Sequence, residues 1–185
     1  MATPPVFTAG AVLTAAQMNQ IGQWVTKVKT SFSAASSITA DNVFSADFES
    51  YLIQVRYITS TTTGIALQLR VGGVSAATNY NRQLLSAAST TVSASQVTSQ
   101  TSLTGLMNAT NGTFYSTSII LLNGPFLTEP TSGWSLNSRA VGAYTSPQQD
   151  FATFNHSTAT SYDGLEMSLG AGTATGNYTV YGLRH

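Results

Sequence analysis

The chain has 185 residues, enough for one domain with a sizeable hydrophobic core, and it contains no cysteine, which excludes disulfides and thiolate chemistry. Charged residues make up only 8% of the chain, and seven basic side chains balance seven acidic ones. The arginines are scattered singly instead of forming the basic stripe of a nucleic-acid binder, so we predict no nucleic-acid partner. No apolar run reaches the length of a membrane span, and the first residues lack the regions of a secretory signal, so we expect no membrane insertion.

The first predicted element is an extended arm over residues 1–13. Pro4 and Pro5 oppose helix formation there, because proline fixes its own backbone angle and lacks an amide donor. An extended arm can attach to a neighbouring protein. We therefore take Pro4, Pro5, Val6 and Phe7 as candidate anchoring residues.

Residues 14–32 are predicted to form a helix. Thr14 is a candidate N-cap, and Gln17 stands three residues later, which is the pattern of a capping box. Apolar residues then recur at alternating steps of three and four, the spacing of a coiled-coil seam: Met18, Ile21, Val25, Val28 and Phe32. Two interpretations remain open, since the helix could join copies of the chain or pack once against its own domain.

Residues 33–43 are small and polar and are predicted to be a linker, which leaves residues 44–185 as a β-module. The apolar period changes to two in this module. Residues 51–57 and 65–71 alternate apolar and polar side chains, and we predict that they form an antiparallel pair joined by a turn near Gly64.

Further strands are predicted along the rest of the module. Residues 74–110 give weaker signals, Asn111-Gly112 is a hairpin turn signal, and residues 114–122 are predicted to be a central strand. Four more predicted strands cover 134–140, 150–156, 165–169 and 178–183. Short strands separated by turns, with no helix between them, indicate an antiparallel sandwich or barrel.

Residues for catalysis or metal binding are sparse. His156 stands before Ser157 and near Asp150 and Asp163, but no nucleophile-elbow motif accompanies them, so we interpret His156 as an exposed turn histidine. The acidic residues are dispersed, whereas glycan cleavage needs two carboxylates at a defined separation. We therefore expect no enzyme activity, no catalytic residues, no metal and no cofactor.

Carbohydrate binding without cleavage remains a hypothesis. Flat aromatic rings can stack on a sugar, although the usual role of an aromatic residue in a sandwich is in the core or an interface. Trp134, Tyr144 and Tyr162 are the candidates for ligand stacking, because each lies beside a predicted loop.

Three segments resemble parts of one family. The ending SYDGLEMSLGAGTATGNYTVYGLRH resembles the C-terminal β-module of tailed-bacteriophage virion proteins, with its aromatic-Asp-Gly turn and final VYG strand. The first hairpin of that module is similar to Phe48, Tyr51, Leu52 and Ile53 followed by LQLRVGG and Tyr80. The opening FTAGAVLTAAQMN is similar to the start of many minor tail or fibre proteins of phages that infect actinobacteria.

The resemblance implies a virion structural protein that is made in the host cytoplasm and is usually trimeric. It implies a mainly β fold, an antiparallel jelly-roll-like β-sandwich preceded by one N-terminal α-helix and an extended arm. The expected partners are further copies of the chain, other virion proteins bound through the N-terminus, and a host-surface glycan. The expected function is a tail fibre or minor tail protein that contacts the host envelope. The alternative is a capsid decoration or head-fibre protein docked on the shell through its arm.

Overall fold

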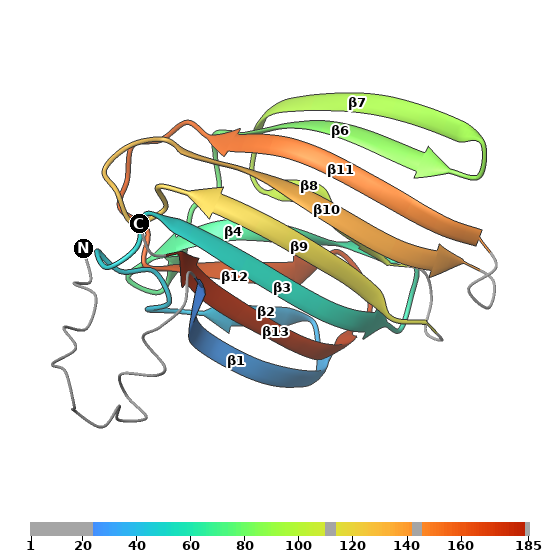
Figure 1. The fold of residues 1–185 in the computed structure, drawn as a ribbon, viewed down its shortest axis with the longest axis horizontal. Helices are drawn as coiled ribbons and strands as arrows, with labels where there is room; N and C mark the ends of the chain where they lie inside the picture. Colours follow the sequence, from blue (N-terminus) through green and yellow to red (C-terminus); the bar gives the residue numbers. More distant parts are fainter. Residues whose placement is uncertain (1–23, 110–113, 142–145, 184–185) are drawn as a thin grey trace, which may run out of the picture.

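The computed structural model describes residues 24–109, 114–141 and 146–183, and these residues form two antiparallel β-sheets with no helix among them (Figure 1). The expectation of a mainly β fold is therefore confirmed. The larger sheet has eight strands, in the order β1 (Trp24–Ala35), β13 (Ala174–Leu183), β3 (Ser50–Thr59), β9 (Ser116–Asn123), β10 (Thr131–Val141), β11 (Ser146–His156), β6 (Tyr80–Ala88) and β7 (Thr91–Gln100).

The smaller sheet has five strands and lies behind the larger one in Figure 1. Its order begins β2 (Ser37–Ala40), β12 (Gly164–Leu169), β4 (Thr63–Val71). Two strands share the far edge of β4, namely β5 (Val74–Ser75) and β8 (Leu103–Ala109). Along the chain, β1 to β4 alternate between the two sheets, with β1 and β3 in the larger sheet and β2 and β4 in the smaller one. The later strands β8, β9, β12 and β13 also alternate, and the hairpin β10–β11 interrupts this alternation between β9 and β12.

The core lies between the two sheets. Alternate side chains of β3 (Tyr51, Ile53, Val55 and Tyr57) have no exposed surface, as the period of two in residues 51–57 predicts. From the smaller sheet, β4, β8 and β12 contribute fully buried aliphatic side chains. Burial on one face of each strand gives the sandwich its stability, because apolar area removed from water contributes about 25 cal/mol per Å².

The prediction of a helix over residues 14–32 is wrong from Trp24 onward. Residues 24–35 form β1, which pairs with β13, and residues 14–23 lie outside the described residues. The register shifts between Thr26 and Val28, so the step of three from Val25 to Val28 comes from a β-bulge. Because the strand contains one extra residue, its apolar residues have the spacing that is expected of a helix. Its β-branched residues, in contrast, favour a strand.

The predicted linker at 33–43 is also part of the sandwich. Ser37–Ala40 forms β2, and Ile38 and Ala40 are buried in the core together with Val43. The residues of this segment are mostly small and polar because only one side of the short strand β2 faces the core. The predicted boundary at residue 44 therefore does not separate two structural units.

The pairing predicted for residues 51–57 and 65–71 is wrong as well. Both segments are strands, but β3 belongs to the larger sheet and β4 to the smaller one. The chain crosses from one sheet to the other through the turn at residues 60–62, and the two strands face each other across the core. Residues 116–122 lie in β9 between β3 and β10, as the prediction of a central strand requires.

Candidate functional site: the outer face of the eight-stranded sheet

Two hairpins extend one side of the larger sheet. The hairpin β6–β7 and the hairpin β10–β11 join through pairing of β6 with β11. We call these four strands the hairpin extension. Its inner face carries buried residues such as Tyr80, Asp150 and Phe154, and its outer face, the side away from the smaller sheet, carries the residues between them.

The outer face presents a continuous group of apolar side chains. Leu52, Leu121 and Trp134 are direct cross-strand neighbours, and Ile119, Leu136, Phe151 and Leu85 form the adjacent row. With Tyr181 on β13 beside Leu52, we call these eight residues the apolar band. Within the band, the exposed fractions are 37% for Trp134, 41% for Leu136, 44% for Phe151 and 45% for Leu85. A contiguous group of exposed apolar side chains is a candidate interaction site.

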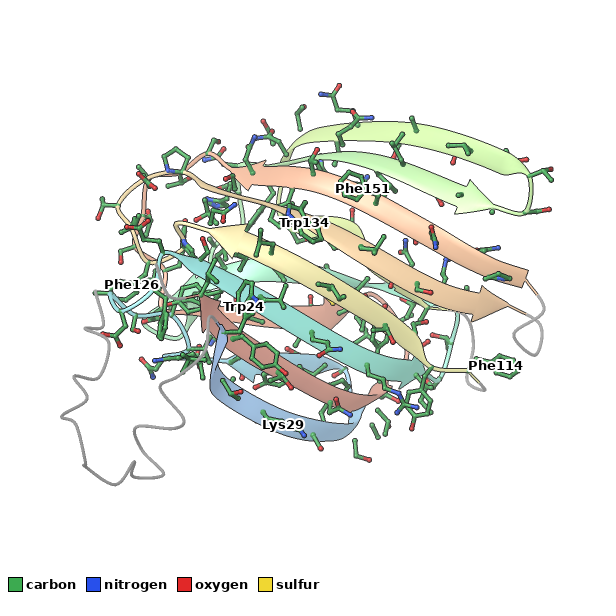
Figure 2. All side chains as sticks on the ribbon, in the orientation of Figure 1. Trp24, Lys29, Phe114, Phe126, Trp134 and Phe151 are labelled. Carbon is green, nitrogen blue, oxygen red and sulfur yellow. The ribbon has the colours of Figure 1, made fainter. Side chains whose placement is uncertain are left out.

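Trp134 and Phe151 are the aromatic centre of this band. They lie on the neighbouring strands β10 and β11 (Figure 2), and their ring centroids are 6.5 Å apart with an interplanar angle of 30°. An aromatic pair in this geometry is stabilising beyond its buried area, yet both rings keep part of their faces in solvent. They therefore form a rigid surface that a flat ligand or a partner side chain can contact.

Five strands place only uncharged side chains on the outer face around the band. The residues that β6, β7, β9, β10 and β11 place there, where the structure describes them, include no Asp, Glu, Lys or Arg. The nearby outward cation Arg56, on β3, lies 3.4 Å from the ring centroid of Tyr115. This surface therefore favours an uncharged partner.

A depression of about 220 Å³ lies beside the apolar band. It is lined by Asn81, Arg82, Gln83, Gln96, Thr153, Phe154 and Asn155. Arg82 and Phe154 are buried residues of the inner face, and we call the five outward residues Asn81, Gln83, Gln96, Thr153 and Asn155 the amide pocket. Asn81 Nδ2 donates to Asn155 Oδ1 at 2.7 Å, and the amide of Ser99 donates to Asn81 Oδ1 at 3.0 Å. Thr153 links the pocket to the band, because it is the cross-strand neighbour of Trp134.

The inner face of the hairpin extension holds a buried carboxylate. Asp150 is 1% exposed and accepts hydrogen bonds from Ser86 Oγ at 2.6 Å, Asn108 Nδ2 at 2.9 Å and Asn137 Nδ2 at 3.1 Å. Arg139 Nε lies 3.5 Å from the same carboxylate. These bonds tie β6, β8, β10 and β11 together, which is a structural role.

Another acidic group braces the smaller sheet. Arg70 joins Asp41 at 2.7 Å and Glu166 at 3.1 Å, and Ser75 and Ser37 donate to Glu166. These serine bonds, with smaller effects of Arg70, lower the pKa of Glu166. The Asp163 carboxylate accepts from the amide of Gly72. Among the described residues, no group of three His, Cys, Asp or Glu side chains could hold a metal ion.

The interpretation of His156 as an exposed turn residue is wrong. It ends β11 with 1% of its surface exposed, because the period of two continues to the last residue of that strand and turns its ring inward. Its Nδ1 lies 3.3 Å from the hydroxyl of Tyr162, and burial lowers the pKa of the imidazole. Tyr162 is itself only 2% exposed, so its assignment as a ligand-stacking residue is wrong too.

The other predicted site residues have separate outcomes. Trp134 is exposed on the outer face, while Tyr144 lies outside the described residues. Three of the seam residues pack against the core of their own chain: Val25, Val28 and Phe32. Met18, Ile21 and the arm residues Pro4, Pro5, Val6 and Phe7 lie outside the described residues. Nothing in the described part of the chain forms a helix long and apolar enough to cross a membrane.

The amide pocket and the exposed ring of Phe151 were not predicted from the sequence. A signal was present, because the uncharged polar residues Asn81, Gln83, Thr153 and Asn155 alternate with the inward residues of 80–84 and 150–156. Alternation alone could not show that the two segments are neighbours, since this depends on the pairing of β6 with β11.

Comparisons with known proteins give no relative for this chain. No protein-family model matches the sequence, and searches of curated proteins and of solved structures also found no match.

Proposed function

We propose that this chain is a non-enzymatic bacteriophage virion structural protein, a trimeric tail-fibre or minor tail protein whose β-module contacts the host envelope. The sequence resemblance at both ends and in the first strands supports the family. The observation that carries the function is the apolar band, an uncharged and partly exposed surface on a paired sheet to which a partner can bind.

The strand order supports a jelly-roll-like fold for the module. In a jelly roll, eight strands form two four-stranded sheets, and viral capsid and lectin domains use this architecture. Four strands of the larger sheet follow the order β1-β13-β3-β9, and four of the smaller sheet follow β2-β12-β4-β8. When these eight strands are counted in chain order, both sheets have the strand order of a double four-stranded jelly roll. The hairpin extension is an addition to this jelly roll.

The addition also supports a contact function. The jelly roll is complete without the hairpin extension, yet the extension carries four of the eight residues of the apolar band and all of the amide pocket. Added elements on a rigid scaffold are where binding residues concentrate. We therefore place the contact with the host on the outer face of the extension.

The test is immunogold labelling of intact virions with antibodies against the purified chain. We expect gold on the tail or its fibres, and Fab fragments against the chain should block adsorption of phage to host cells. Label confined to the head contradicts the tail assignment and favours the alternative, a decoration or head-fibre protein. Particles without any label would overturn the virion assignment.

A further inference from the structure

We propose that the amide pocket, with Trp134 beside it, binds one neutral sugar ring of a glycan. The identification of this glycan as part of the host envelope rests on the proposed function, but the chemistry of the site does not. Four features support this proposal: the polar groups, the backbone that holds them, the aromatic neighbour and the uncharged outward side chains around the depression.

The polar groups of the pocket match sugar hydroxyls. A side-chain amide offers both donors and an acceptor, so it can bond to a hydroxyl that also does both. Within the described part of the chain, the side chains of Gln83 and Gln96 have no hydrogen bond to protein, and both are exposed. They are cross-strand neighbours, so their amides stand side by side at one wall of the depression.

Asn81 and Asn155 are held in place before any ligand arrives. The bond from Asn81 Nδ2 to Asn155 Oδ1 and the bond from the Ser99 amide to Asn81 Oδ1 fix how both amides are turned. The amide nitrogen of Asn155 is then directed away from Asn81 and can donate to a ligand. Preorganised groups bind more tightly because less conformational entropy is lost.

A β-bulge produces this arrangement. Tyr80 pairs with Gln100 and Arg82 pairs with Val97, so Thr98 and Ser99 together stand opposite Asn81. Ser99 has a φ of 53°, a left-handed conformation that is unfavourable for a residue other than glycine. Bulges and strained residues recur beside binding sites, where they redirect a side chain or an amide.

The ring of Trp134 and the size of the depression indicate which kind of ligand can bind. Trp134 is joined to the pocket through Thr153, so its exposed ring can stack on the apolar face of a sugar whose hydroxyls reach the amides. The depression of about 220 Å³ is smaller than the roughly 300–1,000 Å³ of sites for drug-sized ligands, and it has room for one sugar ring. The side chains that β6, β7 and β11 place on the outer face around the depression carry no charge, so the ligand should be neutral.

The experiment is saturation-transfer NMR on the full chain at millimolar ligand concentration. The neutral ligands are the methyl glycosides of glucose, galactose, mannose, rhamnose and N-acetylglucosamine, and methyl glucuronide is the charged comparison. We expect transfer to at least one glycoside. A Trp24→Phe variant leaves Trp134 as the remaining tryptophan, and its emission should shift with the same glycoside.

Variants locate the binding. Trp134→Leu and Gln83→Ala should each weaken the glycoside at least about tenfold, a change of about 1.4 kcal/mol. Gln149→Ala is the matched control, because Gln149 is an exposed amide on the outer face of β11 that does not line the pocket. Thermal melting should show that all three variants stay folded, since the substituted side chains are exposed.

Four results would overturn the proposal. These are no transfer to any glycoside, binding that survives both pocket variants, preference for glucuronic acid over the neutral sugars, and Trp134 emission that acrylamide cannot quench. The last result would mean that a second copy of the chain covers this face. Glycoside binding without virion labelling would refute the proposed function alone, and labelled virions without glycoside binding would refute only this site.

Discussion

The imidazole of His156 lies between two tyrosine rings in the interior of the sandwich. Its ring centroid is 4.3 Å from that of Tyr80 and 5.2 Å from that of Tyr162, both in edge-to-face geometry. Burial disfavours the charged imidazolium, which lowers the pKa of His156. This histidine therefore makes the stability of the fold depend on pH.

The first prediction is a loss of stability as the pH falls. Above the ordinary histidine pKa of about 6.5, His156 is neutral in both the folded and the unfolded chain and contributes no pH dependence. Below about pH 6.5 the unfolded chain binds a proton more readily than the folded one, so the free energy of unfolding decreases. Urea denaturation at intervals from about pH 7.5 to about pH 5 should show a slope of at most about 1.4 kcal/mol per pH unit.

Two variants distinguish the contribution of His156 to the pH dependence of stability from that of other titratable groups. The chain has two histidines, so His185→Gln should keep the slope and His156→Phe should remove it. NMR titration of the wild-type imidazole gives the pKa directly if His156→Phe does not fold. A flat stability profile, or an imidazole that titrates above 6.5, would show that the ring is not held neutral by burial.

At the scale of elements, β1 shows how an edge strand is joined to the sandwich. Its inward residues Val25, Val28 and Phe32 pack on the core, and Lys29 pairs with Thr179 of β13. Lys27 stands at the bulge, with its Nζ 5.2 Å from the centroid of the Phe48 ring. Lysines and bulges on an edge strand hinder pairing with other molecules.

The second prediction tests this register with engineered cysteines in a chain that has none of its own. Lys29→Cys combined with Thr179→Cys should form a disulfide under mild oxidation, because cross-strand neighbours have Cβ atoms about 4.5–5.5 Å apart. A count of free thiols after oxidation measures the yield.

The control is Lys29→Cys combined with Tyr181→Cys, a pair displaced by two residues on the same face. This pair should stay reduced, since its sulfur atoms cannot meet without backbone movement. Equal yields from both pairs, or no disulfide in either, would contradict the pairing of β1 with β13 and reopen the interpretation of this segment as a helix.

At the scale of the whole molecule, the structure removes part of the helical seam from which a trimer was expected. Three of the five seam residues are partly buried against the core of their own chain, and Met18 and Ile21 alone are too short a repeat for a coiled coil. The trimer is therefore proposed from the resemblance. Several copies of one weak sugar site would bind a repetitive glycan far more tightly than a single copy.

The third prediction concerns the mass of the full chain in solution. Light scattering after size exclusion should give three times the mass of one chain at micromolar concentration. In that trimer, acrylamide should still quench the emission of Trp134 in the Trp24→Phe variant, because the proposed sugar site must remain open. A monomer at all concentrations would contradict the assembly.

The sequence by itself determined the class of the fold and much of its strand content. Alternating apolar residues in 51–57 and 65–71 predict strands, since side chains on successive residues of a strand point to opposite faces. Alternation does not say which strand is the partner, so β3 and β4 were wrongly paired. It also fails at a bulge, and the extra residue near Lys27 led to the prediction of a helix.

Only the tertiary structure decided which aromatic and polar residues are accessible. Trp134 and Tyr162 are both aromatic residues beside predicted loops. In the structure, however, Trp134 is exposed on the outer face, and Tyr162 is buried beside His156. The amide pocket likewise needs Gln83, Gln96 and Asn155 from three strands, which pairing between distant segments brings together. The physical reason is that local sequence governs the direction of a side chain, whereas contacts between distant strands govern what lies around it.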